Sequence, residues 1–539
     1  MKRFDTFGVM IDMSRNAVMS MDGLKRFLSL LKKMGYNCVM LYTEDTYEVD
    51  GEPYFGYMRG RYSKQEMKEL DAFATSLGIT VIPCIQTLAH LNGIFRWGKF
   101  PRDCEDILLT DSDRTYQLID RMFATLSECF KSRKIHIGMD EAHMLGRGKH
   151  LDTHGYETVN AIMKRHLAKV CELAEAYGYE PMVWSDMYFR PWNKGQYYAP
   201  KCEMPKEVID ALPEKVIPVY WDYYHTNASN FSDMIENHKQ LSKKTWFAGG
   251  AWCWSGLIPF NRFTLTSMIP AIDACRAHKI RNVFLTMWGD DGAECSHFSQ
   301  LPALFYPAEY AKGNTDEEKI KAKFRRFIGI DFDDYMNIDC PNGVIPYEGM
   351  PKNPSKYMLY SDYFNDFLDY TIKEGVGTEY YKKCAESLSA TAKKSRKYGY
   401  VFDTAAKLCD VLAIKYDLGL RTRKAYEAHD KAELECLAKN EYVLVEKRIE
   451  AFERAFEKQW FLDNKPHGFD VQEHRLGALL LRTRSCRRRL LDYVNGKIGR
   501  IDELDEPLLP FRNPEESTLI NRTPLITTVN IPHHCAVIL

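Results

Sequence analysis

The feature that most constrains the fold is an alternation of two patterns that repeats eight times before about residue 312. One pattern is a short apolar run rich in Val, Ile, Phe, Tyr and Trp, which is typical of a buried parallel strand. These runs span residues 7–12, 38–43, 80–86, 134–140, 181–185, 216–222, 246–252 and 283–288. The other pattern has helical period, as in residues 21–34, 63–77, 113–130, 156–177 and 263–278. Eight such units in roughly 300 residues predict a (β/α)₈ barrel.

Local signals support these helix limits. Ser63 is followed three residues later by Glu66, which is the spacing of a capping box. Gly35, Gly78 and Gly178 each stand just past the last turn of a predicted helix. An open doubly wound sheet could also use eight strands, but no G-x-G-x-x-G opens the first helix. The barrel is therefore favoured over the dinucleotide-binding alternative.

The pattern changes near residue 316, where strands nearly vanish. Residues 342–354 are rich in Pro and Gly, and helical stretches follow at 356–372, 379–396, 402–428, 430–458 and 471–495. The chain exceeds the length of a single core, which stops growing near roughly 250–300 residues. We therefore predict a catalytic barrel at 1–314, a linker region at 315–355, an all-α C-terminal domain at 356–503 and an irregular tail at 504–539.

Composition and charge exclude several classes of function. The net charge of −1 gives no field to attract nucleic acid or an anionic membrane. No run approaches about 18 apolar residues, and the first apolar run is too short for a signal peptide. The fifteen cysteines include no C-x-x-C pair, which indicates free reduced thiols rather than a metal cluster or a disulfide framework. We expect a cytoplasmic protein with no metal and no cofactor.

Polar and aromatic residues gather at the ends of the predicted strands, where catalytic groups of such barrels lie. The ends carry one arginine, one histidine, several carboxylates and tryptophans from four strands: Arg15, Glu44, Asp45, His90, Asp140, Glu141, Asp186, Asp222, Asp290, Trp184, Trp221, Trp252, Trp254 and Trp288. No lysine ends a strand, which argues against Schiff-base chemistry. Acids for a glycosidic oxygen together with flat rings for the C–H face of a sugar predict a sugar-cleaving site.

Asp140 and Glu141 are neighbours at the end of the fourth run. Strand alternation would point them to opposite faces, so both can face one pocket only if the strand ends there and the backbone turns. A carboxylate nucleophile needs its partner acid roughly 5 Å away, usually on another strand. Two adjacent acids instead suit a reaction in which the substrate supplies the nucleophile.

The residues around this pair resemble a known family. His136-Ile137-Gly138-Met139-Asp140-Glu141 resembles the H-x-G-x-D-E motif of glycoside hydrolase family 20, the β-N-acetylhexosaminidases. Asp12 to Arg15 is similar to the family's D-x-x-R, Tyr220 to Asp222 to its Y-x-D, and Trp288 to Asp290 to its W-x-E with Asp replacing Glu. The resemblance covers residues 1 to about 312 and looks closest to the hexosaminidase D-like and bacterial intracellular branch. The common D-x-P-G-H motif is absent, with His90 alone in the matching place.

The resemblance implies an exo-acting, retaining hydrolase that removes terminal β-linked N-acetylglucosamine or N-acetylgalactosamine through an oxazolinium ion. It implies that Glu141 is the acid and base, that Asp140 orients the acetamido N–H, and that Tyr220 binds the acetamido oxygen. The remaining substrate-binding residues that it implies are Arg15, Asp45, His90, Trp184, Asp222, Trp254, Trp288 and Asp290, with Trp252 as the alternative to Trp254. The expected partner is a glycan that ends in N-acetylhexosamine.

Two other readings stay open from the sequence. One is a barrel glycosidase whose nucleophile is a protein carboxylate on strand six or seven. The other is a non-catalytic carbohydrate-binding protein that kept the barrel. The choice between the two sugars is also open, and a homodimer formed through the helical domain is an open alternative for the assembly.

Overall fold

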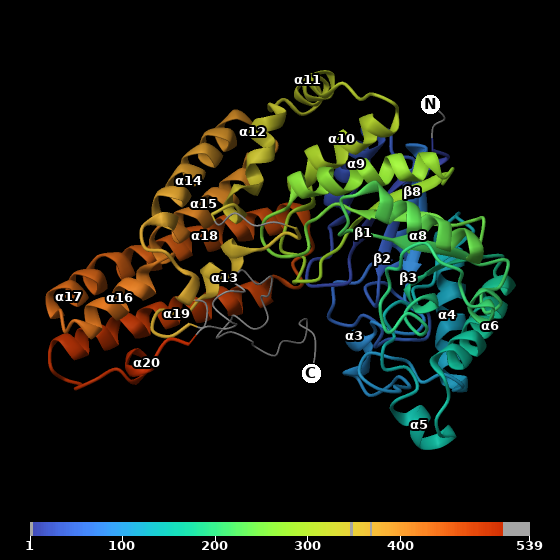
Figure 1. Cartoon of the computed structure of the whole chain (residues 1–539), viewed down its shortest axis with the longest axis horizontal. Helices are drawn as coiled ribbons and strands as arrows, with labels where there is room; N and C mark the ends of the chain where they lie inside the picture. Colours follow the sequence, from blue (N-terminus) through green and yellow to red (C-terminus); the bar gives the residue numbers. More distant parts are fainter. Residues whose placement is uncertain (1–3, 345–348, 367–368, 510–539) are drawn as a thin grey trace.

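The computed structural model describes residues 4–344, 349–366 and 369–509, so most of the predicted tail lies outside the described residues. Its first part is a closed barrel of eight parallel strands in sequence order, which confirms the predicted fold (Figure 1). The strands are β1 (Thr6–Asp12), β2 (Cys38–Thr43), β3 (Thr80–Ile85), β4 (Lys134–His136), β5 (Glu180–Trp184), β6 (Ile217–Trp221), β7 (Trp246–Gly250) and β8 (Asn282–Met287).

The strands close into a barrel because each is apolar on both faces. In β1 every residue from Phe7 to Asp12 is buried, and Val9 pairs with Val39 of β2 on one side and Leu285 of β8 on the other. The pairing of β1 with β8 is the step that closes the sheet. Burial on both faces is expected of a parallel sheet that helices cover on the outside.

Helices surround the barrel and follow the strands in turn. They are α1 (Met21–Met34), α2 (Lys64–Ser76), α3 (Asn92–Phe95), α4 (Asp113–Cys129), α5 (Lys149–His154), α6 (Val159–Ala176), α7 (Lys206–Ile209), α8 (Ala228–Leu241), α9 (Asn261–Ala277) and α10 (Leu301–Ala311). The predicted capping box of Ser63 and Glu66 is present at α2. Gly35 ends α1 with a φ of 100°, the left-handed conformation that a glycine adopts without strain.

The stretch that we expected to be a linker is largely helical. It contains α11 (Glu317–Ile328), α12 (Phe332–Met336) and the 3₁₀ turn η3 (Asn337–Asn342). Ile320, Phe324 and Ile328 recur every four residues and are buried, and the ring of Phe324 lies 5.5 Å from that of Phe305 in α10. The apolar stripe of α11 therefore packs on the barrel's last helix.

The C-terminal part is helical, as predicted. It contains α13 (Pro354–Tyr360), α14 (Val376–Lys394), α15 (Gly399–Lys415), α16 (Leu418–Glu427), α17 (Lys431–Lys439), α18 (Glu441–Asp463), α19 (Phe469–Val494) and α20 (Asp502–Asp505). The stretches 402–428 and 430–458 each form two helices instead of one. Within the described ranges, no helix has both the length and the apolar character needed to cross a membrane.

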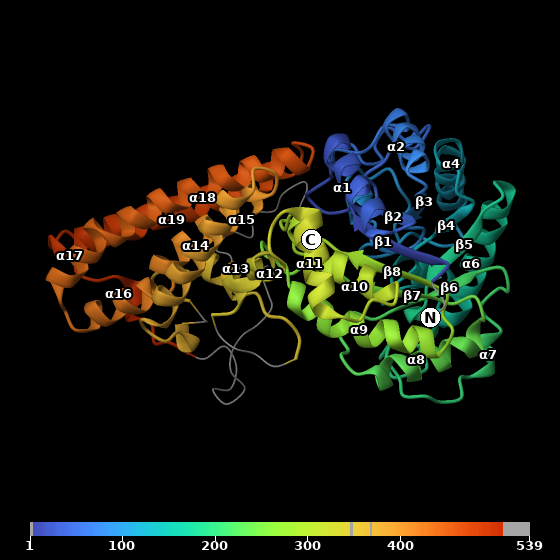
Figure 2. The same cartoon turned by 90° about the horizontal axis from the view of Figure 1, so that it is seen from above.

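The helical part stands beside the barrel, and the long helices α18 and α19 run side by side away from it (Figure 2). The turn between these two helices touches the barrel: Lys465 donates its N–H to Val18 O at 2.7 Å. Asp463, the last residue of α18, accepts from Ser296 Oγ of the barrel at 2.6 Å. The two parts are therefore joined by buried polar contacts as well as by the chain.

Candidate active site

A pocket of about 150 Å³ opens at the carboxyl end of the barrel. Each of the eight strands ends within five residues of a lining side chain, and the loop after β7 supplies Trp254. The lining residues are Arg15, Tyr42, His90, Asp140, Glu141, Trp184, Trp221, Tyr223, Tyr224, Trp254, Trp288 and Asp290. Eight of them are among the residues that the sequence predicted for the site.

A turn in the backbone brings both neighbouring acids to this pocket. Strand β4 stops at His136, and Gly138, Met139 and Glu141 then adopt φ values of 73°, 71° and 50°. Gly138 cannot carry a side chain here, because a Cβ would lie 2.0 Å from Gln86 Oε1. The early end of the strand is the condition under which Asp140 and Glu141 can share one pocket.

Asp140 is held as a carboxylate by two neighbours from the β3 end. Its Oδ1 accepts from Gln86 Nε2 at 2.8 Å, and its Oδ2 lies 3.3 Å from His90 Nε2. Burial alone would raise the pKa of Asp140, but the charge of His90 and these hydrogen bonds hold it below its ordinary value. The reciprocal attraction of Asp140 overcomes burial at His90 and raises the pKa of that imidazole. Gln86 ends the third apolar run, but the sequence pattern predicts no role for it.

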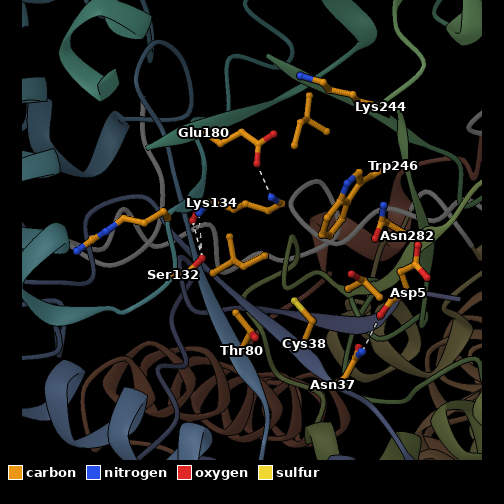
Figure 3. Close-up of a pocket in the computed structure, with 14 residues that line it drawn as sticks. Asp5, Asn37, Cys38, Thr80, Ser132, Lys134, Glu180, Lys244, Trp246 and Asn282 are labelled. Atoms are coloured by element: carbon orange, nitrogen blue, oxygen red, sulfur yellow. Dashed lines mark hydrogen bonds and ion pairs between the residues drawn. The ribbon is translucent and has the colours of Figure 1, made fainter. Parts of the chain in front are cut away.

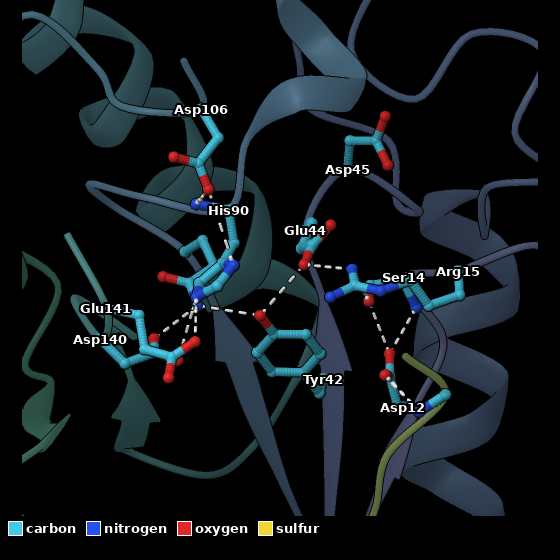
Figure 4. Close-up of polar contacts among 12 residues, drawn as sticks. Asp12, Ser14, Arg15, Tyr42, Glu44, Asp45, His90, Asp106, Asp140 and Glu141 are labelled. Atoms are coloured by element: carbon cyan, nitrogen blue, oxygen red, sulfur yellow. Dashed lines mark hydrogen bonds and ion pairs between the residues drawn. The ribbon is translucent and has the colours of Figure 1, made fainter. Parts of the chain in front are cut away.

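The backbone of His90 fixes the position of its imidazole. It has a φ of 58° and donates its N–H to Asp106 Oδ2 at 2.9 Å. Figure 4 shows the imidazole between Asp106 and the pair of acids. Its Nε2 lies 3.9 Å from Glu141 Oε2 as well, so His90 faces both carboxylates.

Glu141 is the more open of the two acids, with 41% of its side chain exposed. Its backbone N–H donates to Asp186 Oδ2 at 3.0 Å, and Arg190 Nη2 lies 3.4 Å from Glu141 Oε1. Burial and the nearby charge of Asp140 raise the pKa of Asp186 to about 7. Asp186 ends β5 without lining the pocket, and we did not include it among the predicted site residues.

A polar network forms the wall contributed by β1, β2 and β3 (Figure 4). Arg15 Nη1 pairs with Glu44 Oε1 at 2.5 Å, Glu44 accepts from the hydroxyl of Tyr42 at 3.2 Å, and Gln86 Nε2 donates to that hydroxyl at 2.9 Å. Arg15 is therefore linked through hydrogen bonds to Gln86 and Asp140.

Aromatic rings form most of the remaining wall. Trp184, Trp254 and Trp288 line the pocket as predicted, and Trp252 stacks behind Trp254 with ring centroids 4.3 Å apart. Asp290 lies among them, and burial raises its pKa to about 7. Tyr42, Trp221, Tyr223 and Tyr224 also line the pocket and were not predicted.

Tyr220, predicted as a catalytic residue, and Asp222, predicted to bind substrate, do not line this pocket. Both side chains are fully buried, and the hydroxyl of Tyr220 donates to Asp222 Oδ2 at 2.7 Å. The ring of Tyr220 stacks on His238 of α8, on the outside of the barrel. Side chains alternate along a strand, so it is Trp221 and Tyr223 that face inward.

Asp45, predicted to bind substrate, does not line this pocket either, and its side chain is 1% exposed. Its Oδ1 pairs with Arg59 Nε at 3.2 Å. Asp45 therefore braces the loop between β2 and α2.

A larger hollow of about 770 Å³ lies at the opposite end of the barrel (Figure 3). The first residues of the strands line it, among them Thr6, Lys134 and Trp246. Lys134 forms an ion pair with Glu180 there, and Asp5 forms one with Arg281. Because barrel chemistry resides at the carboxyl ends of the strands, we assign no reaction to this hollow.

Three side chains of metal-ligating types lie close together away from the pocket, but an arginine already pairs with two of them. The ligand atoms of Asp111, His150 and Glu157 lie within 4.8 Å of one another. However, Arg165 Nη2 donates to both carboxylates at 2.7 Å. The guanidinium supplies the positive charge that these acids need, so we assign no metal there.

Comparison with known proteins identifies both parts of the chain. Residues 4–231 match the catalytic domain of glycosyl hydrolase family 20, and residues 331–522 match the glycoside hydrolase 20C C-terminal domain. Between them the two matches cover most of the chain.

Individual relatives are distant. Hexosaminidase D of Bos taurus is 22% identical over 340 residues, covering 57% of this chain and 92% of the relative. Hexosaminidase D of Homo sapiens is 23% identical over 213 residues, covering 37% and 41%. A solved exo-β-N-acetylglucosaminidase from Vibrio harveyi aligns with a TM-score of 0.48 and 15% identity; the alignment covers 62% of this chain and 59% of that one. On the two domain matches, the chain belongs to glycoside hydrolase family 20, the β-N-acetylhexosaminidases.

Proposed function

We propose that this protein removes terminal, non-reducing β-linked N-acetylglucosamine or N-acetylgalactosamine with retention, using the substrate's acetamido group as the nucleophile. The observation that carries the proposal is that the neighbouring residues Asp140 and Glu141 both reach one aromatic pocket. Two adjacent carboxylates cannot flank the anomeric carbon from opposite faces, as a nucleophile and its acid must. An ionised Asp140 beside a more open Glu141 fits substrate assistance instead.

In the first step the acetamido oxygen attacks the anomeric carbon while Glu141 gives its proton to the departing glycosidic oxygen. The C–O bond to the leaving group breaks, and the sugar becomes a bicyclic oxazolinium ion. In the second step Glu141, now a carboxylate, takes a proton from water that attacks the same carbon, and the ring C–O bond to that carbon breaks, which restores the neutral acetamido group. The exposed position of Glu141 suits both events, since the leaving group and the water must reach it.

Asp140 accepts the acetamido N–H and stabilises the positive charge that grows on the oxazolinium ring. Gln86 and His90 keep its oxygens in place, and the lowered pKa keeps it ionised at neutral pH. Fixed charge of this kind stabilises a transition state without reorganisation.

Tyr223 takes the role that the resemblance gave to Tyr220. Tyr223 lines the pocket, and its ring lies 6.4 Å from that of Trp288. Its phenol hydroxyl is a donor suited to the acetamido oxygen. Trp184, Trp254 and Trp288 wall the acetyl group and the sugar ring.

Arg15 and Asp290 bind the outer hydroxyls of the terminal sugar, which closes the pocket beyond that sugar and makes cleavage exo. The charge of Asp290 acts on Arg15, so the two groups offer a donor and an acceptor close together. The cytoplasmic location and the homodimer stay predictions from the sequence.

The acid role of Glu141 is tested by comparing two leaving groups. Glu141→Gln should lose about 10³-fold in kcat on a β-linked disaccharide, but far less on the 4-nitrophenyl glycoside, whose leaving group needs little protonation. Equal losses on both substrates would refute the assignment. A thiazoline analogue of the oxazolinium ion should also inhibit the parent enzyme, and failure to inhibit would refute substrate assistance.

A further inference from the structure

Arg190 lies beside the pocket and contacts the acid Glu141. It follows the 3₁₀ turn η1 (Asp186–Tyr188) that comes after β5. Its Nη2 lies 3.4 Å from Glu141 Oε1. Arg190 is not among the side chains that form the pocket wall, so any effect that it has on the reaction must pass through a neighbour.

The guanidinium of Arg190 is fixed by the loop that carries it. Its Nη1 donates to Gly195 O at 3.2 Å, and its Nε lies 3.4 Å from Asp186 Oδ2. The same oxygen of Asp186 accepts the backbone N–H of Glu141 at 3.0 Å. The Asp186 side chain is fully buried, and only 21% of the Arg190 side chain is exposed. One carboxylate oxygen therefore holds both the cation and the backbone of the acid, which fixes the distance between them.

The charges around Glu141 are of both signs. Three carboxyl groups lie near enough to repel its carboxylate when they are ionised: Asp140, Asp186 and Asp290. Two cations oppose them. His90 Nε2 lies 3.9 Å from Glu141 Oε2, but it lies closer to Asp140 Oδ2, at 3.3 Å. Because attraction falls with distance, Arg190 is the cation that most offsets the repulsion at Glu141.

A cation in this position acts in the first chemical step. As Glu141 gives its proton to the departing glycosidic oxygen, its carboxyl group gains a full negative charge. A guanidinium that is already fixed 3.4 Å from Oε1 stabilises this charge as it develops, without having to reorganise. The stabilisation matters when the leaving group needs the proton, and it matters little for an activated leaving group that departs as a stable anion.

We propose that Arg190 is a positioning residue that holds the Glu141 carboxylate and stabilises the charge gained during proton donation, which enables cleavage of unactivated sugar–sugar linkages. The inference rests on the proposed function. Arg190 acts through Glu141 and does not touch the substrate. Its contribution to kcat should therefore depend on the leaving group of the substrate and on a positive charge at position 190.

The test measures kcat for two substrates in three variants of Arg190. The substrates are the β-1,4-linked disaccharide of N-acetylglucosamine and the 4-nitrophenyl glycoside of one N-acetylglucosamine. Arg190→Met removes the charge, and kcat should fall about tenfold on the disaccharide and less than about twofold on the 4-nitrophenyl glycoside. Arg190→Gln, which keeps a donor for Gly195 O, should show the same difference. Arg190→Lys keeps the charge and should stay within about threefold of the parent on the disaccharide.

A matched control removes another arginine, from the loop after β4. Arg147 is exposed, and its guanidinium lies over the ring of Tyr156, 4.9 Å from the centroid. Arg147→Met should leave kcat for both substrates within about twofold of the parent, because its charge is not held against Glu141. Circular dichroism would check the fold of every variant.

The outcomes separate this inference from the proposed function. A parent enzyme that turned over neither substrate would refute the proposed function. Equal losses on the two substrates in Arg190→Met and Arg190→Gln would show that the arginine only supports the fold, and they would refute the inference alone. No loss on the disaccharide would refute it as well. An Arg190→Lys variant as slow on the disaccharide as Arg190→Met would also overturn the inference, because the charge would then have no effect.

Discussion

The two walls of the pocket are built in different ways. The wall that carries Arg15, His90 and Asp140 is held by residues of the barrel itself, through Gln86 and Tyr42 at the ends of β3 and β2. The adjoining wall carries Trp254, Trp288 and Asp290 on the loops after β7 and β8, and those loops rest on the helical part of the chain.

The support of the second wall is a buried group of charges. Glu294, in the loop after β8, is fully buried and pairs with Lys356 of α13 at 2.6 Å and with Arg475 of α19 at 2.8 Å. Lys356 also donates to Asp291 O at 3.0 Å, and the N–H of Asp291 donates to Trp254 O at 3.0 Å. The helical part thus reaches the residue next to Asp290. The barrel alone therefore holds Arg15, His90 and Asp140, while the helical part supports the loop of Asp290, which we propose binds the sugar.

The largest effect should come from the barrel's own wall. Asp140→Asn keeps the shape and the contact with Gln86 but removes the negative charge that faces the oxazolinium ring. We expect kcat for the 4-nitrophenyl glycoside to fall about 10³-fold with KM little changed. Steady-state kinetics with circular dichroism as a check on folding would measure this. A loss smaller than tenfold would show that the charge is not used in the reaction.

The next largest effect tests which tyrosine binds the acetamido group, Tyr220 of the sequence motif or Tyr223 of the pocket. Tyr223→Phe should lower kcat about 100-fold, because it removes a donor to the oxygen that becomes the nucleophile. Tyr220→Phe is the matched control: it loses the hydrogen bond to Asp222 and about 1 kcal/mol of unfolding free energy, while kcat stays within twofold. The reverse result would restore Tyr220 to the site.

A third prediction concerns the support given by the helical part. Lys356→Met leaves Glu294 with one partner instead of two and should cost about 3 kcal/mol of unfolding free energy. It also frees the loop of Asp290, so we expect KM to rise about tenfold and kcat to change less. Urea unfolding and steady-state kinetics would measure the two effects.

A double variant distinguishes positioning from mere stability. Lys356→Met with Glu294→Leu removes both charges and should recover much of the unfolding free energy. KM should stay raised, because the contact between the Lys356 ammonium and Asp291 O is still missing. If KM returned to the parent value together with stability, Lys356 would have no positioning role.

The smallest expected effect is a pH dependence of binding. Because burial raises the pKa of Asp290 to about 7, its carboxylate form grows as the pH rises through that value. A carboxylate accepts a hydroxyl hydrogen more strongly than the neutral acid, so KM should fall about fivefold between pH 6 and pH 8. Asp290→Asn should raise KM and flatten this profile, and an unchanged profile would assign the titration to another group.

The raised pKa of Asp290 also makes the free energy of unfolding depend on pH. The carboxyl ionises near pH 4 in the unfolded chain and near pH 7 in the folded one. Folded protein therefore loses stability as the pH rises from about 4 to about 7. Asp290→Asn should remove that contribution.

The sequence predicted the barrel and the position of the acid pair because both follow from local patterns. Buried runs with regular spacing specify strands, and barrel chemistry lies where they end. The early end of β4 could be anticipated only as a condition: both acids can face the pocket if the strand stops. Gly138 allows the backbone to turn there because it has no side chain to collide with Gln86. That contact joins the ends of two strands, and the periodicity of the sequence does not reveal it.

At β6 and β2 the structure places predicted side chains away from the pocket, for two different reasons. Tyr220 and Asp222 match a motif, but the alternation of β6 turns them toward α8, and a register of one residue decides the face. Asp45 follows Glu44 at the end of β2, but the loop between β2 and α2 folds back so that Arg59 forms an ion pair with Asp45. The sequence also could not predict that the helical part supports the loop after β8, because Lys356, Arg475 and Glu294 are far apart in the chain.

The most direct test of substrate assistance is the release of 4-nitrophenol from its β-N-acetylglucosaminide beside the matched β-glucoside, which lacks only the acetamido group. We predict turnover of the first and none above background of the second, because only the first carries its own nucleophile. Equal turnover of both would mean that a protein carboxylate attacks the anomeric carbon, and it would contradict the role given to Asp140.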